Sequence, residues 1–217
     1  MRDLTAGSTP RPPRMGPGRP AGAVSIDTRE RVLDAACRCF AQYGYGPATN
    51  NLIAEIAGVT AGSVYYHFGS KSNLFDAVCA YVYGRIVTRS AEALAGAHSI
   101  QGLLQALLAE AMRINHEAPE LAGFVATAPI DARRHPELGE AFARQADRMA
   151  DVLSTAVAAG QQRGLIPSDL QPSEVAAVIS AIVDGFAQAA ASTEVTEMDR
   201  MTDLFDRLLL RPDDPPV

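Results

Sequence analysis

Apolar residues recur at helical spacing through almost all of this chain beyond residue 25, and no segment alternates apolar with polar residues as a strand would. With 47% apolar residues among 217, the chain can bury a large core. The pattern predicts an all-α protein of about nine helices, with breaks at Gly and Pro residues that include Pro119 and Pro129. Three helices are expected before residue 71, and others near residues 71–94, 100–117, 134–162, 172–191 and 196–210.

Charge is unevenly divided along the chain, although the net charge is -6. The first 71 residues hold eight Arg and Lys against five Asp and Glu, whereas the remainder holds eleven against twenty. A modestly basic head therefore precedes an acidic body, and any phosphate binding is expected to be local to the head. Composition alone does not establish DNA binding.

Residues 1–25 are rich in Arg, Pro and Gly and lack the apolar segment of a secretory signal. Because proline removes backbone donors and glycine adds backbone entropy, this arm is expected to be disordered. Its Gly18-Arg19-Pro20 is similar to the centre of an AT-hook, whose arginine enters the minor groove. Two alternatives stay open: a solvated tail, or sequence upstream of a true start at Met15.

The composition gives no sign of a membrane, metal or disulfide protein. The apolar segment at residues 174–192 is interrupted by Asp184, so a buried helix is expected there rather than a membrane span. Cys37, Cys39 and Cys79 have no CxxC or metal-ligand spacing, so no disulfide framework, metal site or cofactor is expected. We expect a cytoplasmic protein.

Capping signals divide the first ordered part into short helices. An Asp-x-x-Glu box at Asp27 and Glu30 is expected to open a first helix that ends at Tyr43-Gly44. Thr49 is a good N-cap for a second helix over residues 50–57. The two helices are joined by a short loop.

A tight turn at residues 58–60 leads to a third helix over residues 61–68, and Ser70 caps a fourth that begins at Lys71. Two short helices joined by such a turn form a helix-turn-helix only if their inward side chains are small or apolar. The expected inward residues meet this condition: Ile53, Ala54, Ala57, Val59 and Val64.

The third helix is then expected to present its first residues and its outer face to a DNA major groove. These residues are Thr60, Ala61, Gly62, Ser63, Tyr65 and Tyr66. Lys71, the only lysine beside eighteen arginines, starts a helix where an ammonium and backbone amides can receive one phosphate. The alternatives are that the tyrosines are packing aromatics and that Lys71 is a solvated surface lysine.

About fifty residues, Thr28 to Val78, strongly resemble the DNA-binding head of the tetracycline-repressor (TetR) family. The most specific parts are R-x-x-[IVL]-L-x-A-A at residues 29–36, AGVT at residues 57–60 and YYHFGSK at residues 65–71. The resemblance implies DNA-backbone contacts from Thr49, Asn50, Tyr65, Tyr66, His67 and Lys71. It further implies that Asn51, Ala61, Gly62 and Ser63 face bases.

Composition and resemblance together predict three parts: the Arg/Pro/Gly-rich arm at residues 1–25, a helix-turn-helix head at residues 26–72 and, as the resemblance implies, a ligand-binding and dimerisation body at residues 73–217. The expected partners are operator DNA, a small-molecule effector and a second copy of the chain, bound through residues 172–191 and 198–210. Simple burial of these two segments against the same chain's core is the alternative. Induction would act through the helix that begins at Lys71. Cavity walls are expected between residues 102 and 160, although core packing explains most of the candidate lining equally well: Met112, His116, Phe124, Phe142 and Met149.

The function expected is that of a sequence-specific transcriptional repressor that a small molecule releases from DNA. An enzyme is disfavoured because no ExxH, no HExxH and no nucleophile elbow is present. A helical adaptor without DNA activity and a transcriptional activator both remain compatible with the sequence. The ligand, the operator and the regulated genes are not specified by the sequence.

Overall fold

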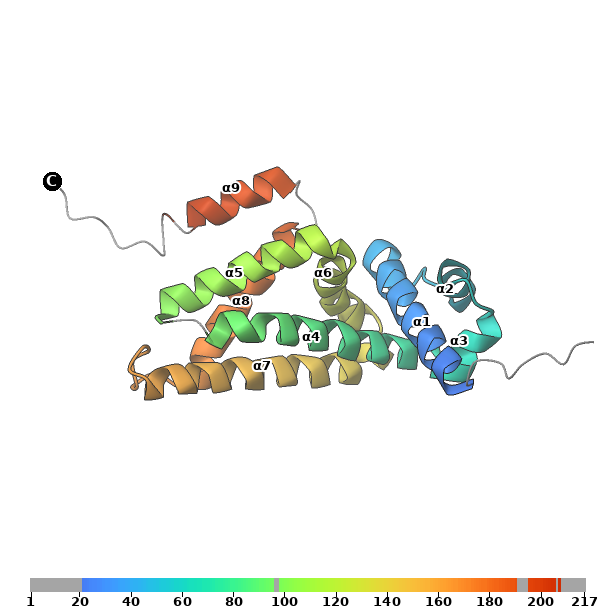
Figure 1. Cartoon of the computed structure of the whole chain (residues 1–217), viewed down its shortest axis with the longest axis horizontal. Helices are drawn as coiled ribbons and strands as arrows, with labels where there is room; N and C mark the ends of the chain where they lie inside the picture. Colours follow the sequence, from blue (N-terminus) through green and yellow to red (C-terminus); the bar gives the residue numbers. More distant parts are fainter. Residues whose placement is uncertain (1–20, 96–97, 191–194, 206, 208–217) are drawn as a thin grey trace, which may run out of the picture.

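The computed structural model describes residues 21–95, 98–190, 195–205 and 207. Within these ranges the chain forms nine α-helices, one short 3-10 helix and no strand, so the prediction of an all-α fold is confirmed. Figure 1 shows an elongated molecule with the head, α1 to α3, at one end and the body, α4 to α9, at the other. The helices are α1 (Ala21–Tyr43), α2 (Asn50–Ala57), α3 (Ala61–Phe68), α4 (Lys71–Ala95), α5 (Ile100–Glu117), α6 (Pro119–Arg134), α7 (Gly139–Gln162), α8 (Pro172–Ala190) and α9 (Val195–Phe205), with the 3-10 helix at Pro136–Leu138.

The first helix begins earlier than its capping signal suggested. α1 starts at Ala21, so Asp27 lies inside the helix and is not its N-cap. The Asp27 carboxylate instead lies 3.9 Å from the Arg31 guanidinium one turn later. Residues 21–25 of the expected arm are therefore helical, while residues 1–20, with the AT-hook-like segment and Met15, lie outside the described residues.

Helix α6 occupies a segment where prolines suggested breaks. Pro119 sits in the first turn, where its missing N–H costs no helical hydrogen bond, and Pro129 lies inside the helix. α6 packs closely on α1, because a Cβ at Gly123 would lie only 3.1 Å from the Cβ of Ala41. This packing compensates for the backbone bond that Pro129 cannot make, and it joins the head to the body.

One core runs through the head and into the body. Phe40 of α1, Phe75 of α4 and Phe124 of α6 are fully buried, and their ring centroids lie 5.4 to 6.4 Å apart. Because α6 covers the side of α1 that α2 and α3 leave open, Cys37 and Cys39 are both fully buried. Burial raises the pKa of the Cys37 thiol to about 12.

A second core lies deeper in the body, where α5, α7 and α8 meet. Its centre includes Leu108, Val157 and Ile179. α9 lies over α5 and α8, with Met198 fully buried and the rings of Phe186 and Phe205 5.1 Å apart. None of the described helices has both the length and the apolar character needed to cross a bilayer.

Candidate DNA interface and ligand cavity

Both ends of α2 are fixed by side chains. Thr49 caps the first turn, where its hydroxyl accepts a hydrogen bond of 3.2 Å from the amide of Leu52. At the other end, Gly58 takes up the left-handed conformation, with φ at 63°. Arg31 of α1 donates to the carbonyls of Ala57 (2.6 Å) and Gly58 (2.9 Å). α1 therefore closes the C-terminal end of α2 and holds the turn.

After the turn at residues 58–60, α3 begins with its first residues on the surface of the head. The Thr60 hydroxyl accepts a hydrogen bond of 3.1 Å from the amide of Ser63 and lies 3.0 Å from the Ser63 hydroxyl. Val64 and Phe68 are buried against α1 and α2, whereas Tyr65 and Tyr66 are 67% and 83% exposed. The two tyrosines lie on the surface of the head and contribute nothing to its core.

The remaining residues expected at DNA are distributed along the same two helices. Thr49, Asn51, Thr60 and Gly62 are exposed, and Asn50, Ala61, Ser63 and His67 are partly buried. Asn50, at the start of α2, has a buried side-chain oxygen with no hydrogen-bond partner among the described residues. The ring centroid of His67 lies 5.3 Å from that of Tyr66, while its neighbour Phe68 is buried in the core.

The structure places Lys71 against the loop between α1 and α2. Its ammonium donates to the carbonyls of Tyr45 (2.8 Å) and Gly46 (3.2 Å), and it lies 4.1 Å from the centroid of the Tyr45 ring. Partial burial lowers the Lys71 pKa from its ordinary value. Two of its three donors are therefore engaged within the protein.

The same loop is tied to the body from the other side. Asp131 of α6 is buried and accepts a hydrogen bond of 2.8 Å from the backbone amide of Tyr45. The left-handed Gly44 precedes it, and the ring of His135 lies 4.9 Å from the Tyr45 ring. The position of the helix-turn-helix thus depends on α6 as well as on α4.

The body contains an apolar cavity of about 130 Å³ between α4, α5, α6, α7 and α8. Among the described residues that line it, Asp184 is the one acidic side chain, and none is basic. Partial desolvation raises the pKa of the Asp184 carboxyl, and deeper burial raises the pKa of the nearby Tyr83 phenol. The walls include Tyr83, Ile86, Val87, Ser90, Leu107, Met112, Asn115, Ala122, Val125, Met149, Val152, Val183, Asp184 and Phe186.

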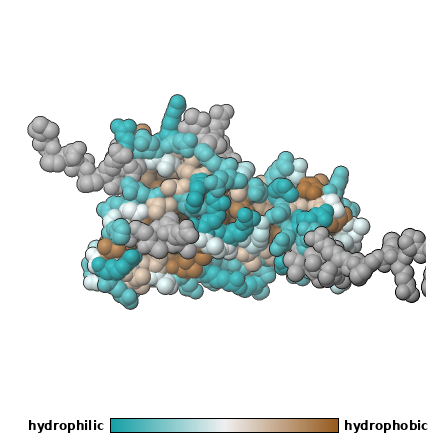
Figure 2. Space-filling model, viewed as in Figure 1, coloured by the Kyte–Doolittle hydropathy of each residue, from teal (hydrophilic) through white to brown (hydrophobic). Residues whose placement is uncertain are grey.

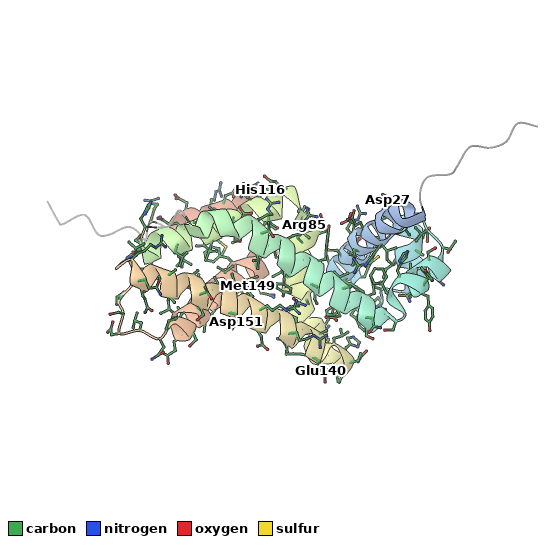
Figure 3. The ribbon with its side chains drawn as sticks, turned by 60° about the horizontal axis from the view of Figure 1, so that its bottom comes forward. Asp27, Arg85, His116, Glu140, Met149 and Asp151 are labelled. Carbon is green, nitrogen blue, oxygen red and sulfur yellow. The ribbon has the colours of Figure 1, made fainter. Side chains whose placement is uncertain are left out.

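The five residues expected at the cavity divide into two groups. Met112 and Met149 line it, and Figure 3 shows Met149 inside the body. Phe124 belongs instead to the core shared with the head, and Phe142 packs against Tyr83 with the ring centroids 6.4 Å apart. His116 is exposed at the edge of the body, 3.6 Å from Asp199.

Two family models match this chain. Residues 32–78 match the model of bacterial regulatory proteins of the tetR family, and residues 100–211 match the C-terminal domain of BetI-type transcriptional repressors. The second match alone covers more than half of the chain.

The chain belongs to the TetR family. This TetR-family protein is a DNA-binding transcriptional regulator, and its relatives are named accordingly. It is 26% identical over 196 residues to the HTH-type transcriptional repressor AcnR of Corynebacterium efficiens, a match that covers 88% of this chain and 97% of AcnR. It is also 26% identical to the HTH-type transcriptional repressor Rv1474c of Mycobacterium tuberculosis, over 76% of this chain and 83% of the relative.

Solved structures show the same fold at lower identity. A TetR-family regulator from Rhodococcus sp. is 22% identical, with a TM-score of 0.72 over 86% of this chain and 100% of that one. FadR of Bacillus subtilis, solved with stearoyl-CoA, is 19% identical, with a TM-score of 0.66 over 81% and 96%. A regulator from Saccharomonospora viridis, solved with choline, is 20% identical, with a TM-score of 0.65 over 85% and 98%.

Sequence reasoning missed several residues that shape this TetR-family regulator. It confined the cavity to residues 102–160, whereas α4 and α8 supply much of the wall, because both cross the body beside α5. It also overlooked Arg31 and Asp131, which fix the helix-turn-helix. Their partners lie 26 and 86 residues away, so no local pattern marks them.

Proposed function

We propose that this regulator is a homodimeric repressor that reads operator DNA with α2 and α3 and is released when a small molecule occupies the body cavity. The main support for the proposed DNA contact is the outward face of α3, where the side chains of Tyr65 and Tyr66 are 67% and 83% exposed. Large aromatic side chains kept out of the core of a small domain are typical of a binding surface. Acting on the chromosome, such a protein works in the cytoplasm.

In this proposal the start of α3 enters the major groove. Ala61 and Gly62 allow close approach, Ser63 and Asn51 supply groups that can pair with base edges, and the two tyrosines reach phosphates. Thr49, Asn50, Thr60 and His67 flank this face along the backbone. Lys71 supports the surface from behind, because its ammonium braces the loop that precedes α2.

The dimer is proposed to form through α8 and α9. Val178 is 61% exposed on α8, and Met201 and Leu204 are 43% and 53% exposed on α9. Ala177, Ala181 and Gly185 are exposed on α8, so small side chains allow close packing of two helices. A pair of α8–α9 faces would form a four-helix interface and place the two heads at the spacing of two DNA half-sites. In the view of Figure 2, α8 lies behind α4 and α5, and the front face shows apolar patches among hydrophilic side chains.

The cavity supports an effector that is mainly apolar and either neutral or cationic. A basic residue is lacking among its described lining, and Asp184 offers one carboxylate at its edge. The cavity of about 130 Å³ is small beside the 300 to 1,000 Å³ of typical sites for drug-sized ligands. The effector is therefore either small or enters by moving the walls apart. Two proteins of related fold were solved with ligands as different as stearoyl-CoA and choline, so the fold alone does not specify the effector.

Two helices, α4 and α6, line the cavity and also contact the head, so a displacement of the cavity walls can be transmitted to the head through them. Ala122 and Val125 of α6 line the cavity, while Gly123 and Asp131 of the same helix contact the head. α4 lines the cavity at Tyr83 and begins beside the helix-turn-helix. A ligand that prefers one head separation would shift the equilibrium toward the released state by its differential affinity for the two states.

The DNA contact is tested by titrating the purified protein with genomic DNA fragments and sequencing those that are retained. We expect a palindromic site with salt-sensitive binding. Ser63→Ala should change base preference at one position by about 1–3 kcal/mol, and Tyr66→Phe should weaken binding to all sites alike. Tyr43→Phe, an exposed tyrosine at the end of α1, serves as the matched control. Sequence-independent binding that neither variant changes would refute the proposed α3 contact.

The effector site is tested with the recovered operator as a probe. A library of small neutral and cationic compounds is screened for release of the protein from the operator. Ala111→Leu, which adds volume to the cavity lining, should keep operator binding and lose the response to a compound found in the screen. Equal release of the variant and the wild type would place the effector elsewhere.

A further inference from the structure

A polar groove of about 830 Å³ lies on the opposite face of α4 from the apolar cavity. It runs between α4 and α5, and no residue that lines it also lines the cavity. Its charged walls are Arg85, Arg89, Arg113 and Glu117, with Tyr81 and Thr88 beside them. The groove plays no part in the function proposed above.

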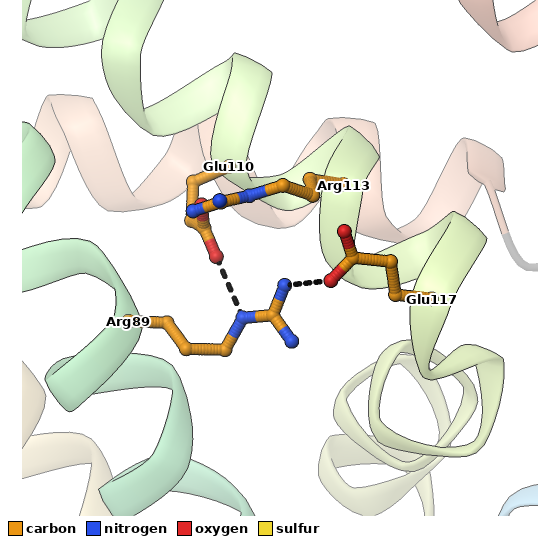
Figure 4. A network of polar contacts seen from close by, with 4 residues as sticks. All are labelled: Arg89, Glu110, Arg113 and Glu117. Atoms are coloured by element: carbon orange, nitrogen blue, oxygen red, sulfur yellow. Dashed lines mark hydrogen bonds and ion pairs between the residues drawn. The ribbon is translucent and has the colours of Figure 1, made fainter.

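A buried carboxylate holds two of these arginines in place. The Glu110 side chain is 3% exposed and accepts hydrogen bonds of 2.8 Å from Nε of Arg89 and from Nε of Arg113. A second nitrogen of Arg113 bonds to the same carboxylate. Figure 4 shows how both guanidinium groups converge on Glu110. A buried carboxylate needs such partners, and the pairing leaves further N–H groups of both arginines for other acceptors.

A second carboxylate already occupies part of the groove. Glu117, in the last turn of α5, accepts a hydrogen bond of 2.6 Å from Nη2 of Arg89. Its side chain is 56% exposed, in contrast to Glu110. Because an exposed ion pair contributes little stability, Glu117 can leave Arg89 at small cost. The arrangement of Arg89 and Glu117 is that of a carboxylate site filled by the protein's own side chain.

The third arginine lies toward the head. Arg85 donates from Nη1 to the Tyr81 hydroxyl at 2.5 Å, and that hydroxyl donates to Asp34 of α1 at 2.5 Å. Figure 3 shows Arg85 on α4 near the head. The rest of the Arg85 guanidinium borders the groove. Three guanidinium groups thus face a space in which Glu117 is the one displaceable carboxylate among the lining residues.

We propose that this groove is a second ligand site, which binds a small anion with two or more carboxylate or phosphate groups in place of Glu117. Arginine forks bind both groups through paired, charge-assisted hydrogen bonds. Arg89 and Arg113, fixed by Glu110, take one end of the anion, and Arg85 takes the other. The site differs in charge and position from the apolar cavity, and its test needs no operator DNA.

The test is calorimetric titration of the full chain with citrate, with pyrophosphate and, as a singly charged probe, with acetate, all at one ionic strength. The wild type should bind citrate, pyrophosphate or both saturably and acetate far more weakly. Which of the two binds distinguishes a carboxylate ligand from a phosphate ligand. Binding of neither would overturn the proposal, whatever the protein does with DNA.

Variants locate the site. Arg85→Gln should weaken binding roughly tenfold, as expected for the loss of one strong charge-assisted contact. Arg144→Gln is the matched control, because it removes an equally charged surface arginine that pairs with Asp76 at 3.1 Å outside the groove. If both variants weakened anion binding equally, the effect would come from net charge alone, and the proposed site would be refuted.

Glu117→Gln gives the opposite prediction. If Glu117 occupies the site of the anion, removal of its charge should tighten binding several-fold. Asp76→Asn removes an equally charged carboxylate outside the groove and should not show this gain, so an equal gain in both variants would reflect net charge alone. Unchanged or weaker binding in Glu117→Gln would overturn the proposed displacement.

Discussion

Substitution of Lys71 by methionine separates two roles that this residue can have in the head. Methionine keeps an unbranched stem of similar length and removes the ammonium. The structure gives that ammonium hydrogen bonds of 2.8 and 3.2 Å to the carbonyls of Tyr45 and Gly46 and a contact of 4.1 Å with the Tyr45 ring. Since Lys71 is half-buried, we expect the free energy of unfolding to fall by about 2 kcal/mol from these contacts together.

The loss of the brace should also weaken operator binding, because the loop positions the start of α2. It should do so at every salt concentration and leave the salt dependence unchanged. A phosphate contact makes a different prediction: removal of two lysines from a dimer lowers the slope of log affinity against log salt by about 1.8. A plot of log affinity against log salt concentration therefore distinguishes the loop brace from the phosphate contact.

The assays are urea unfolding followed by circular dichroism and operator titration at several salt concentrations. Arg38→Met is the control, since it removes one exposed positive charge from the same head. An unchanged unfolding midpoint together with a reduced salt slope would refute the brace and support the phosphate contact that the sequence predicts.

Four further outcomes follow from the geometry. Gly58→Ala should lower the free energy of unfolding by about 1–2 kcal/mol in urea melts, because φ at Gly58 is 63° and an added Cβ disfavours this conformation. Asp131→Ala leaves the buried amide of Tyr45 without its acceptor and should cost about 1–3 kcal/mol in the same assay. Val178→Asp should leave the monomer folded, because the side chain is 61% exposed, and should abolish the dimer proposed to form through α8 and α9, as measured by light scattering. Burial raises the Cys37 pKa from 9.0 to about 12, so the neutral thiol's contribution to the free energy of unfolding is complete below pH 9 and is lost as the pH rises toward 12. Urea melts of Cys37→Ala should therefore show a smaller fall in the free energy of unfolding between pH 8 and 10 than those of the wild type, by about 1 kcal/mol.

The helix-turn-helix could be predicted because its signals are local. Thr49 and Thr60 cap helices through amides three residues away, and Ser70 does the same for α4. Gly58 ends α2 by its own backbone conformation. Such interactions span a few residues, so their partners can be read directly from spacing. The same holds for the exposed face of α3, since helical periodicity places Val64 and Phe68 inward and Tyr65 and Tyr66 outward.

The elements that connect head and body depended on contacts between distant parts of the chain. Pro119 and Pro129 suggested breaks, yet α6 forms because packing against α1 outweighs the lost backbone bond. Phe124, a reasonable candidate for a cavity wall, points into the shared core because α6 presents that face to α1. Sequence periodicity marks a side chain as inward, but not which of two interiors it enters.

The sequence by itself therefore determined the helical class, the helix-turn-helix and its outward face, since each follows from interactions within one or two turns. Only the tertiary structure decided the partners of Lys71, the hydrogen bond from Tyr45 to Asp131, and the walls of the cavity and the groove. These depend on the crossing of helices far apart in the chain. The physical reason is that burial and hydrogen-bond satisfaction are properties of the whole packed molecule, and a local pattern specifies only the need for a partner.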